Sequence, residues 1–372
     1  YKDNAENVAN EVEQHAFTID KTLPVITVAY DNNDAQNGNY YKADRIATLT
    51  IVEHNFDPAR VKNIGFATDS ATGTPVATTF PTISAWQNVG PDTYVATIAY
   101  TADSKYTFDI EFNDMAGNSI VDYTPVEFYV DKTAPTLEIS GVADKSANKG
   151  TVAPIITYSD TNFNVDAVTI TLTGINNGKV NYSAAYAPIT NGQTYTYANF
   201  EEIQKVDDIY TLTAKLVDMA GNETEQTITF SANRFGSVYD LTDVKDILGK
   251  YLTTEQDIVF TETNVDSLDR EDILIKLTKN GTPTDLIEGV DYTVETSGGN
   301  GRWSVYKYTI KKALFAGDGR YSISVYSTDA AGNVNENIDE TKAAEISFGI
   351  DKTTPVIVPI DFESNEQYDV EM

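Results

Sequence analysis

The sequence predicts an all-β protein made of β-sandwich domains joined end to end as an elongated rod. Three observations lead to this fold class. Tyr, Thr, Val and Ile occur in short runs that Pro and Gly separate, which is typical of strands and turns. Apolar and polar residues alternate in several of these runs, so one face of each strand is expected to be buried. Two strings also recur about once per hundred residues, and a fixed period of this kind indicates repeated domains.

A linker string places the domain boundaries. Phe-x-x-Asp-Lys-Thr-x-Pro begins at Phe17, Phe128 and Phe348, and a degenerate copy with Asn233-Arg234 in place of Asp-Lys follows Phe230. We predict domains at residues 20–130, 131–233 and 234–350, the third being divergent and opening with a short helix within 240–252. Residues 1–19 are interpreted as the end of a preceding repeat, and residues 351–372 as the start of a following repeat or a tail.

A turn string, Asp-x-Ala-Gly-Asn, lies near the end of each predicted domain. It begins at Asp114, Asp218 and Asp329, with a Tyr eight residues before each Asp. Successive copies are 104 and 111 residues apart, which is too long for a solenoid and matches one immunoglobulin-like (Ig-like) sandwich. In Ig strand order the Tyr opens strand F and forms a tyrosine corner with the E–F turn. We therefore predict structural roles for Tyr106, Tyr210 and Tyr321.

Strand order also gathers polar residues at one end of each domain. The B–C and F–G loops of an Ig sandwich lie at the pole where strand A begins. The first predicted cluster consists of Asp20, Glu53, Asn55, Asp114 and Asn118. The second consists of Asp131, Asp160, Asn162, Asp218 and Asn222. The preceding domain adds Asp103, which stands three residues before Tyr106, to the surroundings of the second cluster.

Two interpretations of these clusters are open. Carboxylate and amide oxygens suit Ca²⁺, which takes six to eight oxygen ligands, and carboxylates this close repel unless a cation, a proton or a Lys offsets them. Alternatively, the turn string is simply a good F–G turn and Asp-Lys-Thr-x-Pro a good linker. No cofactor is required by the sequence, and Ca²⁺ at the domain junctions is the candidate. The third domain is the weakest candidate because Asn233 replaces the linker Asp.

Composition excludes several classes of partner. The 372-residue chain has 26 basic and 56 acidic residues and a formal net charge of −30. Such a field repels nucleic acid and anionic membranes, which bind through Lys and Arg, so we predict no nucleic-acid partner and no membrane insertion. The chain contains no cysteine, and an exported protein without disulfides fits a Gram-positive surface protein better than an animal extracellular domain.

The pairing of Asp-x-Ala-Gly-Asn with Asp-Lys-Thr-x-Pro resembles the bacterial Ig-like repeat domains of large clostridial-type surface proteins and giant repeat adhesins, from Phe17 to Pro355. The resemblance implies an extracellular, cell-wall-attached protein whose repeats act as a stalk or bind host targets such as immunoglobulin or glycan. It also implies Ca²⁺ at Asp20, Asp114, Asp131 and Asp218, with less support at Asp329.

No catalytic constellation is evident, and we predict that the chain is not an enzyme. Its two histidines, His15 and His54, lack a nucleophile context, and no phosphate-binding loop is present. We expect a monomeric fragment with one of three functions: a spacer roughly 100 Å long, an adhesin module, or an accessory carbohydrate-binding region of a larger secreted enzyme. The candidate ligand-binding residues are aromatics outside the repeat pattern, although a core position is the alternative for the tryptophan. They are Trp303, Tyr306 and Tyr308.

Overall fold

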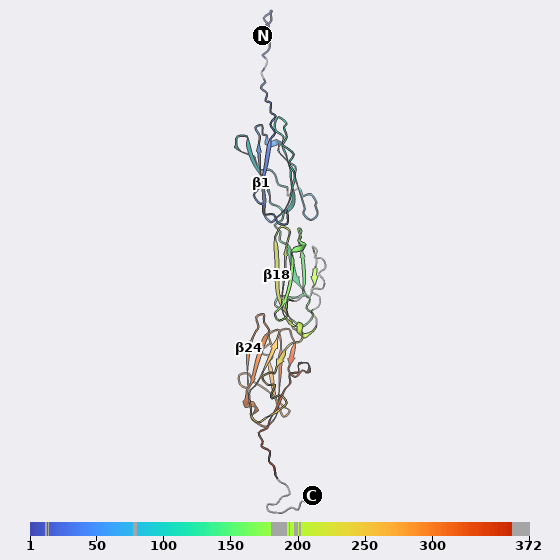
Figure 1. The fold of residues 1–372 in the computed structure, drawn as a ribbon, viewed down its shortest axis with the longest axis vertical. Coiled ribbons are helices and arrows are strands. Elements are labelled where there is room, and N and C mark those ends of the chain that lie inside the picture. Colours follow the sequence, from blue (N-terminus) through green and yellow to red (C-terminus); the bar gives the residue numbers. More distant parts are fainter. Residues whose placement is uncertain are drawn as a thin grey trace, which may run out of the picture.

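The computed structural model describes residues 1–11, 13, 15–76, 80–179, 192, 194–196, 200 and 202–358. Figure 1 displays three β-sandwiches placed one after another along the longest axis. Their strands occupy residues 25–130, 136–232 and 238–350, here called domains 1, 2 and 3. The predicted fold class, tandem Ig-like sandwiches in an all-β chain, is confirmed.

Domain 1 consists of two packed sheets with strand orders β1-β3-β7-β6 and β2-β10-β8-β5. Alternate residues of β3 are buried, as expected for a strand with one face on the core. A two-stranded sheet, β4-β9, extends the second layer toward the F–G turn. The strands are β1 Val25–Tyr30, β2 Tyr40–Tyr41, β3 Arg45–Val52, β4 Lys62–Asn63, β5 Phe66–Thr68, β6 Gln87–Gly90, β7 Thr93–Tyr100, β8 Ser104–Phe108, β9 Ile110–Glu111 and β10 Val126–Val130.

Domain 2 repeats this plan with strand orders β11-β13-β16 and β12-β18-β17-β14-β15. Its longest hairpin, β17 with β18, is paired over ten residues and forms the F and G strands. The strands are β11 Thr136–Ser140, β12 Ala147–Asn148, β13 Ile155–Ser159, β14 Val168–Gly174, β15 Gly178–Lys179, β16 Thr194–Thr196, β17 Asp208–Val217 and β18 Glu223–Ala232.

Domain 3 has strand orders β19-β21-β25-β24 and β20-β28-β26-β22-β23, with β27 paired to β26. The short strand before strand B pairs in parallel with the last strand, as it does in the other two domains. The strands are β19 Val238–Asp240, β20 Tyr251–Leu252, β21 Ile258–Asn264, β22 Leu274–Lys279, β23 Thr282–Asp285, β24 Tyr292–Ser297, β25 Ser304–Ile310, β26 Gly319–Thr328, β27 Val334–Glu336 and β28 Ile346–Ile350.

The predicted helix within residues 240–252 is wrong. The chain instead makes successive three-residue turns, in which Val244 N–H donates to the Leu241 carbonyl and Ile247 N–H to the Val244 carbonyl. This spacing lets Val244 and Ile247 pack into the core of domain 3 before the chain continues as β20. The helices among the described residues are single 3₁₀ turns, and none of these is long and apolar enough to span a membrane. They are η1 Pro58–Arg60, η3 Val165–Ala167, η4 Gln204–Val206, η5 Lys312–Phe315 and η6 Glu340–Lys342.

Strand F carries the repeated core of each domain. The residues two after the corner tyrosines are Phe108, Leu212 and Ile323, and all three are fully buried. Apolar packing therefore occupies the position where an antibody domain has a disulfide. Each corner hydroxyl donates to the carbonyl four residues earlier, as the tyrosine-corner prediction describes. The pairs are Tyr106 with Ala102 (2.8 Å), Tyr210 with Val206 (2.5 Å) and Tyr321 with Gly317 (2.5 Å).

The coloured segments that enter the first sandwich and leave the third are extended in Figure 1. Among the described residues of 1–19, an isolated bridge joins Lys2 to Val8. Residues 351–358 continue from β28 without a strand, and residues 359–372 lie outside the described residues. The assignment of both segments to neighbouring repeats stays a prediction.

Candidate metal centres at the domain poles

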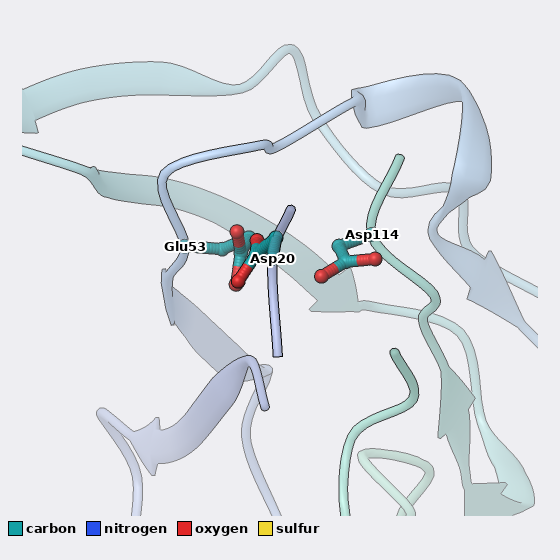
Figure 2. Close-up of side chains that lie close together, drawn as sticks. All are labelled: Asp20, Glu53 and Asp114. Atoms are coloured by element: carbon teal, nitrogen blue, oxygen red, sulfur yellow. The ribbon is translucent and has the colours of Figure 1, made fainter. Parts of the chain in front are cut away.

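Three segments of domain 1 meet at the pole where β1 begins. The linker supplies Asp20, the residue after β3 is Glu53, and the F–G turn after β9 supplies Asp114. One carboxylate oxygen from each lies within 4.8 Å of the others. Figure 2 shows these carboxylates converging from separate stretches of backbone. The structure therefore brings together the carboxylates of the first predicted cluster.

Two asparagines complete the first cluster. The Asn55 side chain donates to Asp20 Oδ2 over 2.6 Å, and the Asn55 N–H donates to Glu53 Oε1 over 2.7 Å. Asn118 donates to both oxygens of Asp114 and to the Asp20 carbonyl. These bonds fix the B–C and F–G loops against the linker, as the turn interpretation of the strings expects.

The second cluster repeats these contacts at the junction between domains 1 and 2. Carboxylate oxygens of Asp131, Asp160 and Asp218 lie within 4.8 Å of one another. The Asn162 side chain donates to Asp131 Oδ2 (2.7 Å) and its N–H to Asp160 Oδ1 (2.6 Å). Asn222 donates to both oxygens of Asp218 and to the Asp131 carbonyl. All five predicted residues therefore meet at this junction.

The two clusters differ electrostatically. Burial raises the pKa of Asp160 to about 6, with the charges of Asp131, Asp218 and Asp103 adding to the rise. Burial also raises the pKa of Asp131. By contrast, the Thr22 N–H and the Asn55 side chain hold the pKa of Asp20 below its usual value. The difference follows from position, because domain 1 covers the second cluster, whereas the half-buried Asp20 of the first cluster follows an extended segment.

A linker clamp joins each domain to the segment that follows it. The Asp that precedes each corner tyrosine by three residues accepts the backbone N–H of the linker Lys or Arg. The pairs are Asp103 with Lys132 (3.1 Å), Asp207 with Arg234 (2.7 Å) and Asp318 with Lys352 (3.0 Å). The basic side chain folds back to a carbonyl of the same pole, at Thr101, Phe200 or Ala316. Asp-x-x-Tyr and Asp-Lys-Thr recur together in the sequence. This shared recurrence could have predicted the contact, although it was not among the contacts predicted above.

Domain 1 also contacts the F–G turn of domain 2 directly. The Asn37 side chain donates to the Met219 carbonyl over 2.8 Å. Met115, the equivalent residue of domain 1, is 63% exposed, whereas Met219 is half-buried. Asn37 lies outside the repeated strings, so this contact could not be predicted from them.

The candidate ligand-binding aromatics lie elsewhere than predicted. Tyr308 is fully buried and Tyr306 is 5% exposed, and the Tyr306 hydroxyl accepts the N–H of Leu268. Trp303 donates its indole N–H to Asp208 of domain 2 over 2.9 Å. This corrects the predicted binding face: both tyrosines point into domain 3 because alternate residues of β25 face the core, and the tryptophan belongs to a domain junction.

The donor sets of the two clusters fit a hard divalent cation. Each offers carboxylate oxygens from three separate segments, and Ca²⁺ prefers oxygen ligands in a loose geometry. At each pole the linker contributes one of these carboxylates, from Asp20 in the first cluster and from Asp131 in the second. A cation there would bridge the linker, strand B and the F–G turn.

No curated protein sequence matches the chain.

Comparison with known families and structures gives bacterial and Ig-like neighbours. Residues 91–233, which run from the end of domain 1 through domain 2, match the family model of the bacterial Ig-like domain (group 3). A tetra-tandem repeat in the extending region of a large adhesion protein is 18% identical, with 90% of this chain and 76% of that chain covered and a TM-score of 0.42.

Two other solved structures are more distant. The adhesin InvE of Yersinia pseudotuberculosis is 12% identical, with coverage of 87% and 97% and a TM-score of 0.26. Human CDH23 EC21-23 is also 12% identical, with coverage of 82% and 91% and a TM-score of 0.29. What these findings establish for the chain is a match to a bacterial Ig-like domain over residues 91–233, within an array of Ig-like sandwiches.

Proposed function

We propose that this chain is a non-catalytic stalk region of a bacterial cell-surface protein, held outside the cell. The observation that carries the proposal is the linker clamp, which fixes the direction in which the chain leaves each domain. An Asp at the end of one domain holds the N–H of the linker that enters the next, at Lys132 and at Arg234. Domains joined in this way keep a fixed separation, which is what a stalk requires. The match of residues 91–233 to a bacterial Ig-like domain supports the bacterial surface assignment.

We further propose that Ca²⁺ stiffens the stalk at the two carboxylate clusters. Asp131, Asp160 and Asp218 are half-buried or buried at the junction between domains 1 and 2, where their charges oppose one another. Like charges this close destabilise the folded junction unless a cation or a proton offsets them. The first cluster has carboxylates in the equivalent positions, with Asp20 half-buried and Glu53 and Asp114 buried.

Calcium should raise the unfolding temperature of the full chain in differential scanning calorimetry. Extracellular modules bind Ca²⁺ with dissociation constants of about 10⁻⁴–10⁻³ M, and a ligand at a hundredfold excess over its dissociation constant adds about 2.7 kcal/mol. The Asp160→Asn variant keeps an acceptor for the Asn162 N–H and should lose much of this gain. Equal unfolding temperatures in Ca²⁺ and in chelator would contradict the calcium proposal.

A groove on the outer face of domain 3 favours carbohydrate binding as a second candidate function. The groove has a volume of about 320 Å³, and its polar lining residues include Tyr251, Thr278, Arg320, Ser322, Glu345 and Ser347. Tyr251 is 55% exposed, and Arg320 Nε donates to its hydroxyl over 2.8 Å. An exposed aromatic ring beside hydroxyl and guanidinium groups suits a sugar, which offers an apolar face and polar edges.

Binding to a glycan array tests this second candidate. We expect the full chain to bind a subset of glycans and the Tyr251→Ala variant to lose at least tenfold in affinity. Tyr1→Ala is the matched control, because Tyr1 is 97% exposed and lies outside the groove. Equal binding by the chain and its Tyr251→Ala variant, or binding to no glycan, would exclude the groove.

A further inference from the structure

The junction between domains 2 and 3 has a different residue at its centre. Asn233 occupies the linker position that is Asp131 in domain 2, and it is fully buried. Its side-chain nitrogen donates to Asn264 Oδ1 (2.8 Å), Asp266 Oδ2 (2.9 Å) and Asp329 Oδ2 (3.0 Å). The positive end of the amide dipole therefore lies among three oxygens, including two carboxylates, where an Asp would add a third negative charge.

The strand-B carboxylate of this junction has different partners from its counterpart in the second cluster. Glu262 corresponds to Asp160, but four hydroxyls of domain 3 hold its carboxylate and it is fully buried. The donors are Ser237 Oγ (2.6 Å), Tyr239 OH (3.3 Å), Ser327 Oγ (2.7 Å) and Tyr308 OH (2.8 Å). In the described part of the chain, close groups of three carboxylates occur at the first two clusters and not at this pole. At the second cluster a cation would relieve the repulsion between carboxylates. At the junction between domains 2 and 3, hydrogen bonds stabilise the carboxylates instead.

Direct contacts between domains 2 and 3 reinforce the same junction. Trp303 donates to Asp208, and Ser231 Oγ donates to Asp266 Oδ2 over 2.9 Å. The Lys149 ammonium donates to the Gly332 carbonyl over 3.1 Å. The clamp here is a buried ion pair, since the side chains of Arg234 and Asp207 are only 7% and 3% exposed. At the first junction the clamp side chain, Lys132, is 38% exposed.

We propose that Asn233 locks the junction between domains 2 and 3 without a cation, so that the rod carries one cation-sensitive joint and one fixed joint. The amide of Asn233 takes the place of the ion by donating to acceptors from strand B and the F–G turn. The fixed half of this proposal depends only on the hydrogen bonds around Asn233. The cation-sensitive half rests on the calcium proposal for the second cluster.

Distance distributions across each joint test the proposal on the full chain. The sequence has no cysteine, so pairs of introduced cysteines are the only sites for spin labels. Ala99→Cys with Glu225→Cys spans the first joint, and Thr211→Cys with Thr293→Cys spans the second; all four side chains are exposed on strands. Pulsed electron-spin measurements then give the width of each distribution in Ca²⁺ and in chelator.

The expected result is a second-joint distribution of the same width in both conditions, and at least twofold broadening after Asn233→Asp in chelator. The control Asn88→Asp adds the same charge at an exposed site of domain 1 and should leave the width unchanged. Broadening of the second joint by chelator in the unaltered chain, or no effect of Asn233→Asp, would overturn the lock. The Asn233→Gln variant keeps the amide but displaces it. A second-joint distribution of intermediate width in this variant would support the lock, because it would show that the position of the amide matters as well as its lack of charge.

The first joint separates this result from the calcium proposal. It should broaden in chelator, and Asp131→Asn should remove that broadening by placing an amide between Asp160 and Asp218. If the first joint is insensitive to chelator while Asn233→Asp still broadens the second, calcium binding has failed and the lock stands. If both joints broaden equally in chelator, the lock has failed and calcium binding stands.

Discussion

Replacing Asp207 by alanine should lower the free energy of unfolding by about 3–5 kcal/mol, the usual cost of removing one partner from a buried ion pair. Asp207 accepts the N–H groups of Arg234 and Phe235 over 2.7 and 2.8 Å and faces the Arg234 guanidinium. Its loss removes the acceptor of two linker N–H groups and the carboxylate that faces a guanidinium with 7% exposure. Burial raises the pKa of Asp207, while these donors lower it. The linker donors therefore stabilise the ionised form of the Asp207 carboxylate, and that carboxylate in turn holds the linker.

Denaturant unfolding of the full chain measures this effect. Trp303 reports on the second junction through its bond to Asp208, and a Trp86→Phe background removes the other tryptophan. Asp103→Ala is the matched control: Asp103 accepts the Lys132 N–H and the Thr133 hydroxyl, whereas the half-exposed Lys132 ammonium pairs with Asp44. This substitution therefore breaks no buried ion pair and should cost less. Replacing Asp207 and Arg234 together by Leu and Met should recover part of the loss, since no unpaired charge is then buried. Equal losses for Asp207→Ala and Asp103→Ala would contradict the assignment.

The repeat strings were enough to predict the fold class and the meeting of both clusters. A period near 100 residues selects a sandwich, and Ig strand order then fixes which loops share a pole. Asp131, Asp160 and Asp218 therefore come together although they are far apart in the chain. Local spacing also predicted the tyrosine corner, because its hydroxyl reaches only a few residues back.

The contacts between domains could not be predicted from the sequence. Asn37 and Trp303 lie in loops that differ between domains, and their partners depend on how successive sandwiches pack. The aromatics of β25 were misassigned because an unmatched tyrosine signals a domain-specific role without saying whether it faces solvent or the core. Tyr308 has such a role: its hydroxyl holds the buried Glu262 carboxylate. The predicted helix in 240–252 failed because Val244 and Ile247, three residues apart, fit consecutive turns on a core as well as one helical face.

In chelator, the stability of domain 2 should increase as the pH falls from 7 to about 4. The folded pKa of Asp160 is about 6, above its ordinary value of 3.8, so the folded state binds this proton more strongly than the unfolded state. The resulting stabilisation is complete below the unfolded pKa and is lost as pH rises through about 6. A shift of this size corresponds to at most about 3 kcal/mol, which solvent screening reduces. Calorimetry of the full chain at several pH values measures the slope.

Calcium should reverse the sign of that slope. A bound cation requires ionised carboxylates, so protons compete with it and the calcium-dependent stabilisation must fall on acidification. Because the chain carries a charge of −30, acid also relieves general repulsion, and Asp160→Asn is needed to subtract this contribution. The difference between the chain and Asp160→Asn should rise toward low pH in chelator and fall in saturating Ca²⁺. A difference that does not vary with pH in either condition would show that Asp160 titrates at its ordinary value and that neither a proton nor a cation relieves the junction.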